Sequence, residues 1–245
     1  MQKIKITAII PAYNEEKNII RVLKVVTKSP LIDEVIVVDN ASTDRTTQQV
    51  RKFSSIKLVV NRKNFGIGYS YWRGAREAKN PLILLCDADL VGLKEEHLQQ
   101  LIFPVIKKQT QMTIGIQEKL SLLNRFRWYR RHAANQKNDS QFIQSLGGQR
   151  VLWKKDFLKV RDLKKSKYGA VQTITNYFLE NNQPFKNLTL MGVGHPWKID
   201  KWGLKGILME FDCLWAIVLN YAKTVLIKLK HKISPVDNQP LTENG

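Results

Sequence analysis

Two aspartates stand one residue apart at the end of a strongly apolar stretch. Asp87 and Asp89 follow residues 82–86, whose side chains are all apolar. Carboxylate oxygens are preferred ligands of Mg²⁺ and Mn²⁺, and such an ion can bridge the two phosphates of a diphosphate. The pair therefore predicts a site for a divalent cation. A turn that ends the strand and caps the next element is the alternative interpretation, because a lone pair of this kind often arises by chance.

The residues before this pair alternate between strand-like and helix-like patterns. Apolar and β-branched runs predict strands at residues 4–10, 34–38, 57–60 and 82–86. Helical spacing and capping residues predict helices at residues 15–28, 44–53 and about 68–79. Strands that are apolar throughout are typical of sheets buried on both faces. The pattern therefore predicts an α/β fold with a mainly parallel central sheet and helices on both faces.

Each predicted strand is followed by a segment rich in polar residues or glycine. These segments are residues 11–16, 39–44, 64–68 and 87–90. In open parallel sheets the ligand binds beyond the carboxyl ends of the strands. We therefore expect the four segments to meet at one edge of the sheet and to form the site together.

Taken in order, these segments resemble the motifs of a known enzyme family. They read Pro11-Ala12-Tyr13-Asn14-Glu15-Glu16, Val37-Val38-Asp39-Asn40-Ala41-Ser42-Thr43-Asp44, Asn64-Phe65-Gly66-Ile67-Gly68 and Asp87-Ala88-Asp89-Leu90. From about residue 4 to residue 91 the sequence resembles the family-two glycosyltransferases, which have the GT-A fold. Within that family it is most similar to the dolichyl- and polyprenyl-phosphate sugar transferases. The resemblance implies a nucleotide-sugar donor, with Mg²⁺ or Mn²⁺ as cofactor.

The resemblance also implies a role for individual residues. Asp89 would be the main metal ligand, and Asp87 would contact the ribose or a metal-bound water. Asp39 would accept a hydrogen bond from the base, a task that suits a carboxylate, with a strand-end turn as the alternative. Asp44 is expected to cap a helix. The other nucleotide-binding residues would be Pro11, Tyr13, Glu15, Asn64 and Gly68.

The second half of the chain resembles the family more thinly. Arg150 lies in a segment where relatives place an arginine near the diphosphate, which suits a guanidinium group. His195 lies in a late segment that supplies a metal ligand or basic groups, with Lys198 as a further diphosphate contact. A surface arginine and a structural histidine are the alternatives. The expected catalytic residues are Asp89, Arg150 and Gln172, and the expected metal ligands are Asp87, Asp89 and His195.

The chain departs from the family pattern at two positions. Relatives carry Lys where this chain has Ile67, so Lys63 or Arg73 would supply that phosphate contact instead. Relatives often carry a carboxylate where this chain has Gln172, and an amide cannot act as a general base. A phosphate acceptor needs little such help, because a second pKa of about 6 leaves it largely ionised at neutral pH. The alternatives are a base elsewhere in residues 139–162, or an inactive paralogue that binds nucleotide.

The charge of the chain indicates an anionic partner. Lys and Arg number 40 against 21 Asp and Glu, which gives a formal net charge of +19. Nucleic acid is disfavoured, because the sequence has no aromatic ribonucleoprotein motif and no zinc pattern. A basic, aromatic helix at residues 119–131 and an amphipathic helix at residues 206–232 suit an anionic membrane surface. The second of these also suits contact between two copies in a homo-oligomer.

These features together give the expected organisation and activity. Residues 1–200 would form one GT-A domain, residues 201–233 an amphipathic helical region, and residues 234–245 a disordered tail. Cys86 and Cys213 lie in apolar runs and are expected to be reduced, in a cytoplasmic protein that is peripheral on the inner face of the membrane. The predicted activity is inverting transfer of a sugar from a UDP- or GDP-sugar to polyprenyl phosphate in cell-envelope glycan synthesis. Transfer to a hydroxyl of a carbohydrate or glycolipid is the alternative.

Overall fold

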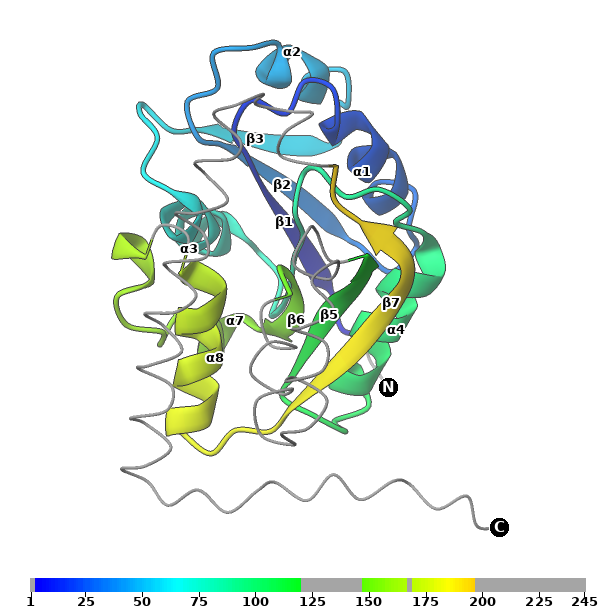
Figure 1. The fold of residues 1–245 in the computed structure, drawn as a ribbon, viewed down its shortest axis with the longest axis vertical. Helices are drawn as coiled ribbons and strands as arrows, with labels where there is room; N and C mark the ends of the chain where they lie inside the picture. The colour runs from blue at the N-terminus through cyan, green and yellow to red at the C-terminus, as the bar shows by residue number, and fades with distance from the viewer. Residues whose placement is uncertain (1–2, 120–146, 167–168, 197–245) are drawn as a thin grey trace, which may run out of the picture.

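A seven-stranded sheet forms the centre of the protein (Figure 1). The computed structural model describes residues 3–119, 147–166 and 169–196. The strands are β1 (Ile6–Ala12), β2 (Glu34–Asp39), β3 (Ile56–Val60), β4 (Leu82–Leu85), β5 (Met112–Lys119), β6 (Gln149–Trp153) and β7 (Phe185–Gly194). The helices are α1 (Ile19–Val26), α2 (Thr46–Val50), α3 (Ile67–Glu77), α4 (Glu95–Ile106), α7 (Lys154–Phe157), α8 (Ala170–Glu180) and the 3₁₀ turn η2 (Leu163–Lys165).

The strands follow one another across the sheet in the order β3-β2-β1-β4-β6-β5-β7. β1 pairs in parallel with β2 and β4, β2 with β3, and β5 with β7. β6 is antiparallel to its neighbours β4 and β5, and is the one described strand that runs against the rest. The prediction of a mainly parallel α/β sheet is therefore confirmed.

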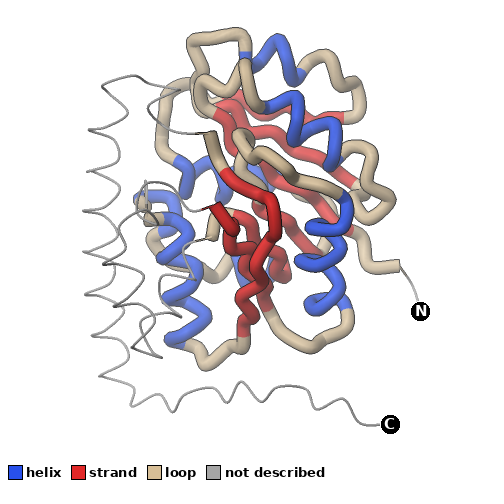
Figure 2. The backbone as a smooth tube through the Cα atoms, turned by 45° about the vertical axis from the view of Figure 1, so that its right-hand side comes forward, coloured by secondary structure: helices blue, strands red, loops and turns tan. Residues whose placement is uncertain are grey.

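Helices cover both faces of this sheet, as the sequence predicted (Figure 2). Along β1, Ala8 and Ile10 belong to the core beneath α1, α2 and α4, whereas Ile9 belongs to the core beneath α3 and α8. Successive residues of a strand point to opposite faces. A strand between two cores is therefore apolar at every position, which explains the continuous apolar runs in the sequence.

The predicted elements differ from the observed ones mainly at their ends. α1 begins at Ile19 rather than at residue 15, because residues 14–16 hydrogen-bond to the loop after β2. β7, which follows the four predicted strands in the chain, continues to Gly194 because it stays paired with β5 as far as Lys119. Many of its side chains are only partly buried, so its apolar pattern is weaker than that of β1 or β4.

Several predictions concern residues outside the described ranges. These are the basic helix beyond residue 119, Lys198, Cys213, the amphipathic helix at residues 206–232 and the tail at residues 234–245. The three-part domain division therefore stays a prediction. Cys86 is a buried free thiol, and burial raises its pKa above the ordinary value. Among the residues that are described, no helix combines the length and apolar character needed to span a bilayer.

Candidate active site

Hydrogen bonds tie the loop after β1 to the loop after β2. The backbone N–H of Asn14 donates to Ser42 Oγ at 3.0 Å, and that of Glu15 donates to Thr46 Oγ1 at 2.7 Å. In return, the side-chain oxygen of Asn14 accepts from the N–H of Thr43 at 2.8 Å. Asn14 has a φ of 56°, a left-handed conformation that Asn tolerates better than most residues. The two loops therefore form one unit where β1 and β2 end.

A chain of asparagines connects this unit to the loop after β3. Asn40 Nδ2 donates to Asn64 Oδ1 at 2.7 Å. Asn40 Oδ1 accepts from Asn61 Nδ2 at 2.9 Å and from the N–H of Phe65 at 3.1 Å. The predicted nucleotide-binding residue Asn64 is thus held next to the second loop, and three of the four predicted segments meet at one edge.

The third loop also shows how the chain accommodates its departures from the family pattern. A Cβ at Gly68 would lie 2.1 Å from the carbonyl oxygen of Leu163, so glycine lets η2 pack directly on the first turn of α3. Arg73 donates to Asn61 Oδ1 and to the backbone carbonyl at the end of β3. Lys63 lies over the ring of Phe65, with its Nζ 5.2 Å from the centroid. These contacts place all three residues beside the loop, while their phosphate or nucleotide contacts remain predictions.

The carboxylates of Asp39 and Asp44 accept hydrogen bonds from within the loop after β2 and from the start of α2. The buried carboxylate of Asp39 accepts from the N–H of Ser42 at 3.1 Å and from Thr47 Oγ1 at 2.7 Å. Asp44 Oδ1 accepts from the N–H of Thr46, the first residue of α2, at 2.9 Å. Asp44 thus holds the first N–H of α2, although the N-cap position itself is occupied by Arg45. Asp39 has a clear structural role, and its contact with a base remains a prediction.

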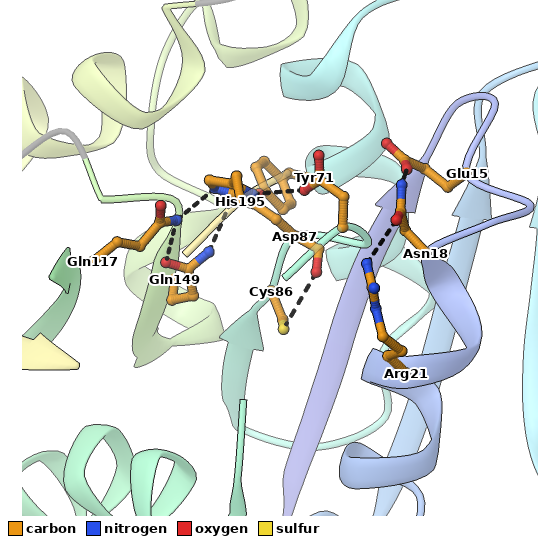
Figure 3. A network of polar contacts seen from close by, with 10 residues as sticks. Glu15, Asn18, Arg21, Tyr71, Cys86, Asp87, Gln117, Gln149 and His195 are labelled. Carbon is orange, nitrogen blue, oxygen red and sulfur yellow. Dashed lines mark hydrogen bonds and ion pairs between the residues drawn. The ribbon is translucent and has the colours of Figure 1, made fainter. Parts of the chain in front are cut away.

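The first loop contributes one exposed and one buried polar residue. The Tyr13 side chain is 37% exposed at the edge of the sheet. Glu15 is buried, and its carboxylate accepts from Asn18 Nδ2 at 3.0 Å (Figure 3). Pro11 lies within β1, opposite Val38 of β2. All three lie on the segment tied to the Asp39 loop, which is compatible with the predicted nucleotide contacts.

Asp87 is fixed by side chains from two other elements (Figure 3). The hydroxyl of Tyr71, on α3, donates to Asp87 Oδ1 at 3.1 Å. Gln149 Nε2, on β6, donates to Asp87 Oδ2 at 2.7 Å. A Cβ at Gly148 would lie only 2.2 Å from Asp87 Oδ2, so glycine makes room for the carboxylate. Both oxygens of Asp87 thus have defined partners in the protein.

The imidazole of His195 contacts both aspartates of the pair. Its Nδ1 lies 2.8 Å from Asp89 Oδ1, and its Nε2 lies 3.4 Å from Asp87 Oδ2. Nε2 also meets the amide of Gln117, from β5 (Figure 3). The backbone is held in place two residues after Asp89, where an antiparallel bridge joins Val91 to Gly194. Residues 106 positions apart are therefore brought together at the carboxyl edge of β4.

The two carboxylates determine the protonation state of His195. Burial acts to lower the pKa of its imidazole, but hydrogen bonds and attraction to Asp87 and Asp89 outweigh burial and raise the pKa from 6.5 to about 10. Burial and the nearby Asp87 likewise raise the pKa of Tyr71 well above 10.0. At neutral pH, Tyr71 therefore stays a hydrogen-bond donor and His195 is an imidazolium.

The chemistry of the predicted metal ligands suits a divalent cation, but their present arrangement does not. Asp87, Asp89 and His195 offer oxygen and nitrogen donors, a set that Mn²⁺ accepts. In the described part of the chain, however, no group of three or more His, Cys, Asp or Glu residues is arranged as a metal site. His195 instead hydrogen-bonds to Asp89. A histidine that binds a metal is neutral. The donor set therefore fits a divalent cation once His195 loses its proton and its imidazole no longer contacts the two carboxylates.

Arg150 lies inside the sheet rather than on its surface. The residue is 0% exposed, and its Nη1 donates to Thr175 Oγ1 of α8 at 2.8 Å while its Nε donates to the carbonyl of Gly147 at 3.1 Å. Burial lowers its pKa to about 9, although the charge of Asp87 acts to raise it. The alternative of a surface arginine is therefore wrong. A direct contact with a diphosphate stays a prediction.

Gln172 is buried on α8, where its Nε2 donates to Asn176 Oδ1 at 3.1 Å. Gln172 therefore lies within α8, and its role at the acceptor remains a prediction. Lys198, the second predicted diphosphate contact, lies outside the described residues.

Three residues of the cluster were missed by the sequence analysis: Tyr71, Gln117 and Gln149. Tyr71 has the spacing of an ordinary core residue of α3, and its hydroxyl meets Asp87 only through the tertiary fold. Gln149 and Gln117 lie on neighbouring antiparallel strands, 3.5 Å apart between Nε2 and Oε1. No signal in the sequence singles out Gln149, which is the first residue of β6 and is followed by the charged Arg150.

Comparison with known proteins identifies the family of this chain. The sequence profile of glycosyl transferase family 2 matches residues 7–190, which is most of the chain. The chain belongs to glycosyltransferase family 2. The matched residues include the loops after β1 to β4, Gln149 and Arg150. His195 lies just beyond them.

Individual relatives in the family match less than half of the chain. A dolichol-phosphate mannosyltransferase of Pyrococcus furiosus is 32% identical over 116 residues, which are 45% of this chain and 32% of the relative. A 4,4'-diaponeurosporenoate glycosyltransferase of Staphylococcus haemolyticus is 35% identical over 118 residues, 46% of this chain and 31% of the relative. The chain thus matches about a third of the length of these curated relatives.

Solved structures support the fold over a greater length. Glucosyl-3-phosphoglycerate synthase from Mycobacterium tuberculosis, in complex with phosphoglyceric acid, aligns with a TM-score of 0.64 and 18% identity, over 88% of this chain and 79% of that one. The same enzyme in complex with Mn²⁺, UDP-glucose and phosphoglyceric acid aligns with a TM-score of 0.60 and 18% identity, over 87% and 79%. The GT-A fold expected from the sequence is confirmed.

Proposed function

We propose that this chain is an inverting glycosyltransferase that moves a sugar from a UDP- or GDP-sugar to a membrane lipid phosphate of the polyprenyl-phosphate type. The carrying observation is the cluster of Asp87, Asp89 and His195 at the edge where the loops after β1, β2 and β3 also meet. Family membership supports sugar transfer, and the dolichol-phosphate mannosyltransferase among the relatives supports a lipid-phosphate acceptor.

The donor side of the proposal follows from the loops. Tyr13 and Glu15 follow β1 and Asp39 ends β2, and hydrogen bonds join these two segments, which supports a shared nucleoside site. Tyr71 and Gln149 fix the carboxylate of Asp87, and Asp89 stands beside it with His195. A divalent cation held by Asp89, Asp87 and His195 would offset the negative charge that grows on the leaving diphosphate. Fixed side chains reduce the reorganisation needed as that charge develops.

The acceptor side rests on Gln172. Its amide carries no basic oxygen for a hydroxyl proton, and it is buried with its Nε2 donating to Asn176. A lipid phosphate is already ionised at neutral pH and needs no deprotonation by the protein. The proposal therefore places the enzyme at the cytoplasmic face of the membrane, where such a lipid would be glycosylated for cell-envelope glycan synthesis.

Donor binding is tested by thermal melting. We expect Mn²⁺ with UDP or GDP to raise the melting temperature, because a ligand that binds only the folded state stabilises it. Asp89→Ala should abolish this rise, whereas Glu96→Ala, which removes an exposed carboxylate at the start of α4, should preserve it. A wild-type protein that shows no nucleotide-dependent rise would count against sugar transfer as a whole.

Acceptor chemistry is tested by following a labelled sugar. The protein is incubated with labelled UDP- and GDP-sugars and with vesicles that contain polyprenyl phosphate. The expected product is extractable into organic solvent and labile to mild acid, as a sugar–phosphate ester is. A water-soluble or acid-stable product would overturn the lipid-phosphate acceptor and leave sugar transfer to a hydroxyl in its place.

A further inference from the structure

The outer surface of α3 and η2 carries a row of aromatic rings in contact with cations. The ring centroids of Phe65 and Tyr69 lie 4.5 Å apart, and those of Tyr69 and Trp72 lie 5.6 Å apart. Lys164 Nζ, from η2, stands 3.8 Å above the Trp72 ring, and the Arg76 guanidinium lies 5.8 Å from it. The three rings are partly exposed, and Trp72 also packs against the core beneath α3, so the row borders both the surface and the core. We call it the α3–η2 face.

The segment that includes α7 and η2 adds positive charge to this face. Residues 154–165 contain six basic and two acidic side chains. One of the acids, Asp156, is buried with Lys159 3.5 Å away, and the other, Asp162, lies 3.9 Å from Lys165. On α3 itself, Glu77 is paired with Lys57 at 2.7 Å. The acidic groups are thus matched by neighbouring lysines, and Lys164 and Arg76, which contact the Trp72 ring, leave the face positively charged.

The α3–η2 face adjoins the candidate active site. Phe65, which precedes α3, donates its N–H to Asn40 in the loop after β2. η2 rests on the first turn of α3 through the close approach at Gly68. In Figure 1, α3 and α8 lie on the opposite side of the sheet from α4. A surface bound to the α3–η2 face would therefore lie beside the loops that form the site.

We infer that the α3–η2 face docks on an anionic phospholipid surface. Tyr and Trp side chains favour the boundary between headgroups and acyl chains, and basic side chains are attracted to anionic headgroups. Leu158, which is 40% exposed between α7 and η2, adds an apolar contact of the same kind. This inference extends the proposed function, because a lipid-phosphate acceptor lies in such a surface, but it concerns the membrane itself and requires neither donor nor acceptor.

The test is sedimentation of the full chain with vesicles of phosphatidylcholine alone or mixed with phosphatidylglycerol, without sugar donor or polyprenyl phosphate. We expect the wild type to bind the mixed vesicles and K164E/K165E to bind them about tenfold more weakly or worse, given about 1 kcal/mol for each basic side chain near the surface. The matched control is K107E/K108E, at the end of α4, where Lys107 lies 6.0 Å from the exposed Phe103 ring. It makes the same change in net charge on the opposite face and should bind like the wild type.

Further variants keep the result interpretable. K164Q/K165Q removes charge without reversing it and should be intermediate, and Trp72→Ala should weaken binding at unchanged charge. Unaltered circular dichroism and melting temperature would show that each variant is folded.

Equal losses of vesicle binding in K164E/K165E and K107E/K108E would overturn the inference in favour of a general charge effect. Wild-type binding to RNA but not to the mixed vesicles would overturn it in favour of nucleic acid. Vesicle binding without sugar transfer would contradict the proposed function alone.

Discussion

The two halves of the sheet contribute to the candidate site in different ways. In the first half, β3-β2-β1-β4, the loops after the first three strands are joined by hydrogen bonds between backbone groups and short side chains, such as Glu15 N–H to Thr46 and Phe65 N–H to Asn40. In the second half, β6-β5-β7, the contribution consists of long side chains. Gln149 reaches Asp87 from within a strand, and His195 reaches Asp89 from just beyond one.

This difference separates two tasks. The first half brings together the loops that carry the predicted nucleotide contacts, and most of its ties join neighbouring loops. The second half completes the charged cluster through contacts between residues that are far apart in sequence, 62 positions for Gln149 and Asp87. Changes in the second half should therefore impair metal and diphosphate binding while leaving the loops of the first half in place.

Gly148→Ala should have the largest effect. The new Cβ would lie 2.2 Å from Asp87 Oδ2, a carboxylate already held by Gln149 and Tyr71, so the aspartate must turn away and lose at least one of these partners. We expect Mn²⁺-dependent binding of UDP or GDP to weaken by about tenfold or more, since each lost hydrogen bond to a charged group costs about 1.5–3 kcal/mol. Isothermal titration calorimetry measures this. Unchanged affinity would mean that the position of Asp87 does not matter for the donor.

The same division explains what the sequence could predict. The strands of the first half are short apolar runs that each end in polar residues, as at Asp39 and Asp87, and parallel pairing then places those ends at one edge. Nothing in the sequence fixes the position of β6, because it enters antiparallel between β4 and β5, two strands that precede it in the chain. The contact of Gln149 with Asp87 depends on that placement and could not be predicted.

Arg150 illustrates the limit most clearly. The resemblance to the family marked it as a diphosphate contact, yet alternation along β6 places it on the same face as Leu152, in the core beneath α3 and α8. Pairing with β4 and β5 is what buries that face. Once β6 is recognised as an interior strand, burial of Arg150 follows from the period of two.

Arg150→Met distinguishes these two roles. The substitution retains apolar volume but removes the donors to Thr175 and to the carbonyl of Gly147. We expect the free energy of unfolding to fall by about 1–3 kcal/mol, the usual effect of leaving buried polar groups without partners. Urea denaturation measures this. A variant with unchanged stability that has lost nucleotide binding would instead favour a direct contact with the diphosphate.

Tyr71→Phe should have a smaller effect, confined to the charged cluster. It removes one hydroxyl, and with it the donor to Asp87 Oδ1, while the ring keeps its place in the core. We expect the concentration of Mn²⁺ that half-saturates UDP binding to rise about tenfold, the lower limit for one lost hydrogen bond to a charged group, about 1.5 kcal/mol. Tyr177→Phe on α8 is the control and should leave this concentration unchanged. If Tyr71→Phe lowered the melting temperature without ligand and left the metal requirement unaltered, its hydroxyl would serve folding alone.

The effect of His195→Gln should depend on pH and should be the smallest of all at high pH. The two aspartates raise the pKa of His195 in the folded protein from 6.5 to about 10, so the folded state holds a proton that the unfolded state releases in this interval. The stabilisation from the imidazolium is complete below about pH 6.5 and is lost as the pH rises through about 10. The difference in free energy of unfolding between wild type and His195→Gln should therefore be largest near about pH 6 and shrink towards about pH 10. Urea denaturation across this range measures it, and a difference that stays constant with pH would show that the two halves of the sheet are not joined by a charged His195.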